Sequence, residues 1–195
     1  TATASRLVTV NPLPSPSISP ATVAICSGQT TTLTASGGGT YTWSNSGGPN
    51  ANATFSPTSN TTYTVTVTDA NNCSAAASRL VTVNALPNAT INPTTVAICN
   101  GQSTTLTASG GGTYVWSNSG GANAAANFSP TSSTTYTVTV TNANNCSASA
   151  AQLVTVNAIP NASINPTAAS ICNGQSTTLT ASGGGTYTWS NTGGS

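Results

Sequence analysis

Alternation of apolar and polar residues is the most regular feature of this chain. Residues 61–69 (TTYTVTVTD) place Tyr63, Val65 and Val67 on one side and threonines on the other. Such period-two alternation predicts a β-strand with one buried face. Further strands are predicted at 17–25, 29–36, 40–45, 52–56 and 73–84. Signals for helices are nearly absent.

The breaks in this pattern carry information about strand ends. Pro20 interrupts the first predicted strand, which suits a sheet edge or a strand that changes sheets. Gly37–Gly39 lack the Lys-Ser/Thr and the following helix of a phosphate-binding loop, so a plain strand connection is favoured. Asn71 and Asn72 predict a turn, because asparagine tolerates left-handed backbone geometry.

The whole pattern recurs every 73 residues. Residues 12–84 and 85–157 align without a gap and are identical at 56 of 73 positions. Residues 1–11 match the end of a repeat, and residues 158–195 match the first part of a third one. The sequence therefore predicts a window of a tandem array, with Pro-containing linkers that hold neighbouring domains in line as semi-rigid units.

Six or seven short strands per copy predict an all-β protein of tandem, immunoglobulin-like, antiparallel β-sandwich domains. Tyr41 and Trp43 lie on the same side of a strand, where they form either a sugar-stacking platform or part of the core. The core is favoured because each copy has few other large side chains. Tyr63 is interpreted as a corner tyrosine whose hydroxyl binds backbone. The predicted core aromatic residues are Trp43, Tyr63, Trp116, Tyr136 and Trp189.

Charged residues are nearly absent, and this excludes several function classes. Apart from the termini the chain carries Arg6, Arg79 and Asp69, with no His, Lys or Glu. Acid–base catalysis and metal binding need such groups, so we expect no enzymatic activity and no metal or other cofactor. Two arginines cannot bind nucleic acid, and no apolar run is long enough for a membrane span. Because Arg79 aligns with Gln152, both arginines are expected at an exposed edge.

The cysteines occur in a fixed order, ICxG followed by NNCS. Cys26 and Cys73 are separated by the same interval as Cys99 and Cys146, which predicts one disulfide within each repeat and an oxidising compartment. Such a loop would contribute about 4 kcal/mol in the chain-entropy model. Cys172 would pair with a cysteine outside the window. A zinc site is the weaker alternative, because two thiolates without histidine leave it half empty.

Asparagine-linked sugar is a further hypothesis. Asn52, Asn60, Asn88 and Asn161 fit the N-x-S/T acceptor pattern. Asn72, Asn127 and Asn145 fit it as well, although chance produces many matches in so Asn- and Thr-rich a chain. Sugar linked to the outward rows of threonine is equally conceivable.

The cysteine, tryptophan and strand motifs together resemble those of a known family of repeats. The string ICxGQxTTLTASGGGTYxWSN…FSPTSxTTYTVTVTxANNCS…LVTVN resembles the immunoglobulin-like, PKD-like repeats of large secreted surface proteins of Bacteroidota, including gliding-type adhesins. The resemblance covers the whole chain and implies an extracellular β-sandwich used as a repeat unit, usually without a catalytic role. Asn-Asn replaces the usual Asn-Gly before the second cysteine, and the calcium-binding carboxylates of some related repeats are missing.

Two functions remain open from the sequence. The first is a structural repeat segment of an extracellular bacterial surface filament, stalk or sheath, whose partners are copies of itself or adjacent repeats of the same long chain. Low charge favours lateral packing of such domains. The alternative is a surface adhesin whose repeats bind glycans or a partner protein. The first is favoured, because the copies differ mainly by exchanges among small or polar residues and no outward aromatic cluster marks a binding face.

Overall fold

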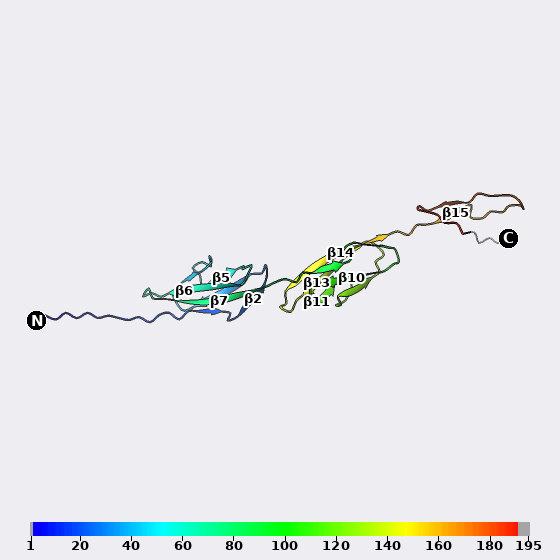
Figure 1. Ribbon diagram of the computed structural model, residues 1–195. Coiled ribbons are helices and arrows are strands. Elements are labelled where there is room, and N and C mark those ends of the chain that lie inside the picture. The colour runs from blue at the N-terminus through cyan, green and yellow to red at the C-terminus, as the bar shows by residue number, and fades with distance from the viewer. Residues whose placement is uncertain (1, 191–195) are drawn as a thin grey trace. The chain divides into compact units, whose positions relative to one another are not determined.

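A computed structural model describes residues 2–190, and within this range regular structure consists of β-strands alone (Figure 1). The first repeat forms β1 (Ser17–Ser19), β2 (Val23–Cys26), β3 (Thr31–Ser36), β4 (Thr40–Trp43), β5 (Asn52–Phe55), β6 (Thr61–Thr68) and β7 (Ser74–Asn84). The second forms β8 (Thr90–Asn92), β9 (Val96–Cys99), β10 (Thr104–Ser109), β11 (Thr113–Trp116), β12 (Ala125–Phe128), β13 (Thr134–Thr141) and β14 (Ser147–Asn157).

Two compact units make up the chain. The first contains the residues up to Ala89 together with Ser109–Tyr114 and Thr139–Ser149. The second contains Thr90–Ala108, Val115–Val138 and the residues from Ala150 onward. Two turns of the second repeat, between β10 and β11 and between β13 and β14, therefore belong to the same compact unit as the first repeat.

Each complete repeat folds into two sheets. In the first repeat the strand order is β1-β3-β5 in one sheet and β2-β7-β6-β4 in the other, and the second repeat has the same arrangement. Strands β1, β3 and β5 correspond to strands A, B and E of an immunoglobulin sandwich, and β4, β6 and β7 correspond to strands C, F and G. Strand β2 corresponds to the second half of strand A and pairs with strand G. The predicted all-β tandem sandwich is confirmed. Most strand pairs are antiparallel, and each complete repeat adds one parallel pair, β2 with β7 and β9 with β14.

The first strand changes sheets at Pro20, as the sequence predicts. β1 pairs with β3 in one sheet, and after a cis Ser19–Pro20 bond β2 pairs with β7 in the other. Arg79 on β7 spans this crossing, because its guanidinium donates to the carbonyl oxygens of Ile18, at 3.0 Å, and Ala21. The expectation of an exposed edge residue is thus wrong for Arg79, which is half-buried and has a buried Nε.

The core lies between the sheets and is built around three aromatic rings. Phe55 stacks on Tyr63 with ring centroids 3.8 Å apart and meets Trp43 edge-on at 5.7 Å. The second repeat places Phe128 between Tyr136 and Trp116 in the same way. Burial raises the pKa of the Tyr63 hydroxyl above its ordinary value. No polar or charged residue among those described is fully buried. The fully buried layer between the sheets is therefore apolar.

Glycine is required at the turn between β3 and β4. Gly39 has a φ of 131°, and a Cβ there would lie 2.2 Å from the carbonyl oxygen of Thr68. Gly38 also has a positive φ but faces open space. The Gly37–Gly39 segment is thus a strand connection, as the sequence predicts, and Gly39 approaches the neighbouring backbone closely.

The given sequence covers only the first part of the third repeat, and the tryptophan in this part lies outside a core. It forms β15 (Ser163–Asn165) and β16 (Thr180–Ser182), which pair antiparallel. Trp189 is 51% exposed, so its assignment to a core is wrong. In the first repeat Trp43 pairs with Val65 of β6 and packs on Phe55 of β5. The given sequence ends at Ser195, before the counterparts of these two strands.

Exchanging the residues at the Arg79 position tests the role of this arginine. Arg79→Gln should destabilise the first sandwich by about 1–2 kcal/mol, because two charge-assisted hydrogen bonds are lost at a half-buried site. Gln152→Arg should stabilise the second sandwich by up to about 1 kcal/mol, because the new guanidinium can reach the carbonyl groups of Ile91 and Thr94. Amide hydrogen exchange resolves the two sandwiches separately. Equal protection in the wild type and both variants would contradict this role.

Candidate functional site: a disulfide between repeats

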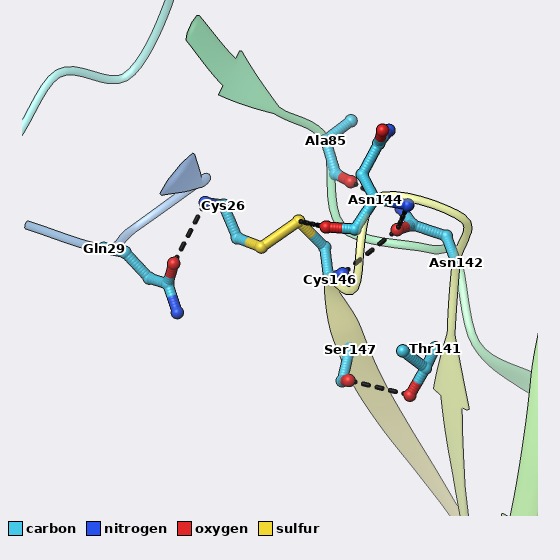
Figure 2. The surroundings of a disulfide bond; sticks show 8 residues. All are labelled: Cys26, Gln29, Ala85, Thr141, Asn142, Asn144, Cys146 and Ser147. Carbon is cyan, nitrogen blue, oxygen red and sulfur yellow. Dashed lines mark hydrogen bonds between the residues drawn. A yellow bond between two sulfur atoms is a disulfide. The ribbon is translucent and has the colours of Figure 1, made fainter. Parts of the chain in front are cut away.

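One disulfide joins the two complete repeats. Cys26 at the end of β2 is bonded to Cys146 in the turn before β14, across 120 residues of sequence (Figure 2). The two Cα atoms are 5.6 Å apart, within the range that disulfides require. Cys73, Cys99 and Cys172 carry free thiols. The chain thus contains a covalent connection between repeats besides its backbone.

The predicted bonds Cys26–Cys73 and Cys99–Cys146 are therefore wrong. Cys26 lies beside Asn84, the last residue of β7, whereas Cys73 immediately precedes the first residue of that strand. A strand of this length separates its ends by about 35 Å, while disulfide geometry needs Cα atoms within about 7 Å. The two cysteines of one repeat thus occupy opposite ends of the same sheet and cannot meet.

A tight turn after β2 fixes the position of Cys26. The Cys26 amide donates to Oε1 of Gln29 at 3.0 Å, and the Gln29 amide donates back to the Cys26 carbonyl at 3.0 Å. The next amide, of Ser27, donates to the carbonyl of Asn84 at 2.9 Å. Gly28 provides the positive φ of 86° that the turn needs. These bonds account for the Cys-x-Gly-Gln motif, in which Gly28 and Gln29 shape the turn.

The turn around Cys146 is held by one asparagine. Oδ1 of Asn142 accepts the amides of Asn144 at 3.0 Å and of Cys146 at 3.1 Å. Asn145 has a φ of 59°, which confirms that the Asn-Asn turn uses left-handed geometry. Cys146 is completely buried, and its Sγ lies 3.8 Å from the carbonyl oxygen of Asn144. Because a disulfide sulfur carries no hydrogen, that approach is a close contact without a donated proton.

Asn142 also contacts the linker between the repeats. Its Nδ2 donates to the carbonyl oxygen of Ala85 at 2.9 Å, while Oδ1 holds the cysteine turn (Figure 2). In the first repeat the equivalent residue is Asp69. Its Oδ1 holds the Cys73 turn with the same bonds, but a carboxylate has no N–H to donate. The Asp69/Asn142 difference therefore changes what this turn can bind.

The other residues singled out from the sequence lie apart from this junction. Trp43 is buried and donates from Nε1 to the carbonyl of Asn50 at 2.9 Å, while Tyr41 is half-buried against the core. Neither ring forms a sugar-stacking platform on the surface. The candidate glycosylation residues Asn52, Asn60, Asn88 and Asn161 are all exposed. Asn60 is partly engaged, because its Oδ1 accepts the amide of Val83 at 2.7 Å.

Across residues 2–190, no group of three or more His, Cys, Asp or Glu side chains is arranged to hold a metal ion. The described part of the chain also has no helix long and apolar enough to cross a membrane.

Comparison with protein-family models and with curated proteins finds no match. Among solved structures, fibronectin(III)-like modules of Clostridium thermocellum CbhA match 74% of this chain and 95% of their own at 10% identity and a TM-score of 0.37. DIP-gamma IG1+IG2 matches 73% of this chain and 98% of its own at 13% identity and a TM-score of 0.36.

The N-terminal four immunoglobulin domains of Dscam1 isoform 8.4 match 69% of this chain and 43% of their own, at 14% identity and a TM-score of 0.32. All these TM-scores are low, so no inference is based on them. The fold assignment rests on the strand order and register described above.

Non-reducing peptide mapping should recover Cys26 linked to Cys146, with thiols at Cys73 and Cys99 accessible to alkylation. The measurement is mass spectrometry of the digested, alkylated chain. A link between Cys26 and Cys73 would contradict the register of β2 on β7.

Replacing Asn142 by aspartate should weaken the junction while leaving the cysteine turn intact. The Asn142→Asp carboxylate would keep the acceptor for the turn amides, as Asp69 does, but would lose the hydrogen bond to Ala85. The loss of one exposed hydrogen bond should lower the equilibrium constant for Cys26–Cys146 formation about three- to tenfold. The measurement is the bonded fraction in a glutathione redox buffer, and Asp69→Asn is the matched control, expected to leave this bond unchanged.

Proposed function

We propose that this chain is a structural repeat segment of an extracellular filament, stalk or sheath on a bacterial surface. The observation that carries the proposal is the disulfide between repeats. A bond within a domain stabilises that domain, whereas the Cys26–Cys146 bond changes how two domains are joined. The resemblance of the repeat motifs to surface proteins of Bacteroidota supports the same role.

The disulfide defines the covalent path along which tension travels. Force applied before Cys26 and after Cys146 passes directly between the two sulfur atoms, because they join the loaded parts of the chain. Residues 27–145 then form a closed loop that tension cannot extend. Strands β3 to β13 lie within this loop, and only β1, β2 and β14 of the two sandwiches lie outside it. A segment that resists lengthening suits a stalk or filament.

The bond also supports an extracellular location. Structural disulfides form and persist in oxidising compartments and are rare where thiol reductants are abundant. The junction residues hold the two cysteines in place through specific hydrogen bonds on both sides. We therefore place the segment outside the cytoplasm as part of the proposal.

The surface chemistry fits close packing of copies. The outward faces of the sheets carry hydroxyl groups that pair across strands, as in Thr64 with Ser78 at 2.8 Å and Thr32 with Thr54 at 3.0 Å. Only 2% of the residues are charged. Because such surfaces repel one another little, their association should depend weakly on salt. Copies of the chain are thus the proposed partners.

Pulling on single molecules between the termini tests the proposed role. With the disulfide intact, unfolding should release no length from residues 27–145. Reduction should add about 400 Å of extensible chain, since the loop spans 120 residues of about 3.5 Å each. The Cys26→Ser variant should show the added length without reductant, and Cys73→Ser, which leaves the bond intact, is the matched control. Release of the loop in the oxidised wild type would refute the proposal.

A further inference from the structure

We infer that the two complete repeats differ in mechanical strength, and that the second yields to tension before the first once the disulfide is open. The observation that carries the inference is the Arg79 side chain, which ties the strand where force enters the first repeat to the strand where force leaves it. The inference rests on the proposed role of the chain as a segment under tension. It adds an order of extension that this role does not itself require.

Tension loads the parallel strand pair of each repeat along its length. With the disulfide open, force enters the first repeat at β1 and leaves it after β7. It pulls β2 toward its amino end and β7 toward its carboxyl end. Because these strands run parallel, all the hydrogen bonds between them are strained together. The second repeat has the same parallel pair, β9 with β14, so its strands are loaded in the same way.

Arg79 adds a second attachment between the two loaded strands of the first repeat. Its backbone belongs to β7, whereas the carbonyl groups that accept from its guanidinium belong to Ile18 in β1 and to Ala21 in the crossing to β2. Separation of β2 from β7 must therefore break these two bonds as well. Since Arg79 is half-buried, its hydrogen bonds are stronger than they would be in water.

The side chain at the equivalent position of the second repeat makes a different bond. Nε2 of Gln152 donates to the carbonyl oxygen of Leu153 at 2.9 Å. Both residues lie on β14, so this bond does not resist the separation of β9 from β14.

Other attachments of the loaded strands are alike in the two repeats. The amide of Ser27 donates to the carbonyl of Asn84 at 2.9 Å, and the amide of Asn100 donates to that of Asn157 at the same distance. The strand order is also the same, and the three core rings of each repeat pack in the same way. The bridge made by Arg79 should therefore make the first repeat the stronger one.

This difference gives the chain two stages of extension. Tension on the open chain first lengthens the second repeat, while the first repeat stays folded until its arginine bridge breaks. A closed disulfide prevents both stages, because β3 to β13 lie within the loop between Cys26 and Cys146.

Pulling on single molecules at constant force tests the inference. The parent chain carries Cys26→Ser and is held in reductant, so both repeats are under tension. Forced unfolding follows the unfolding rate, so the lifetime of each folded repeat is the measured quantity. The two lifetimes should differ about tenfold, because two additional charge-assisted hydrogen bonds must break in the stronger repeat.

Exchanges at the two equivalent positions assign the lifetimes to the repeats. Arg79→Gln in the parent chain should shorten the longer lifetime until the two are similar. Gln152→Arg should lengthen the shorter lifetime, because the new guanidinium can bridge to β8 as Arg79 does to β1. Equal lifetimes in the parent chain, or lifetimes that Arg79→Gln leaves unchanged, would overturn the inference. The parent chain cannot form the Cys26–Cys146 bond, so failure here is distinguishable from failure of the proposed function, which concerns the oxidised loop.

Discussion

The parallel pairing of β2 with β7 is the constraint on which the covalent organisation of this protein depends. It places the end of β2 beside the end of β7, so the cysteine that ends β2 and the cysteine that precedes β7 lie at opposite ends of the sheet. Each complete repeat therefore presents one cysteine at each end. Because neighbouring repeats follow one another along the chain, the one disulfide among the described residues runs between them.

This arrangement leaves each described sandwich without a disulfide of its own. The stacked rings of Phe55 and Tyr63, the indole of Trp43 and the fully buried Leu33, Val65 and Val67 must hold the two sheets together. Domains of this size are often stabilised by a disulfide within the domain. Nearly complete burial of the apolar face of β6 takes over that role here.

The strands were predictable because each depends on a local signal. Alternation along β6, the glycines between β3 and β4 and the interruption at Pro20 all correspond to observed features. The disulfide pairing was not predictable, because equal spacing of cysteines reveals nothing about which strand ends meet. Arg79 was missed for another reason: Gln152 at the equivalent position of the second repeat suggested an exposed edge residue, whereas the Arg79 guanidinium bridges the crossing between sheets. Both errors concern contacts between residues distant in sequence.

The closed loop made by Cys26 and Cys146 also gives the junction redundancy. Two independent covalent connections, the linker beginning at Ala85 and the disulfide, run from one repeat to the next. A protease that cuts the linker once leaves the repeats attached through sulfur, and a reductant that opens the disulfide leaves them attached through the backbone. Only both events together separate them, so the chain tolerates either form of damage alone.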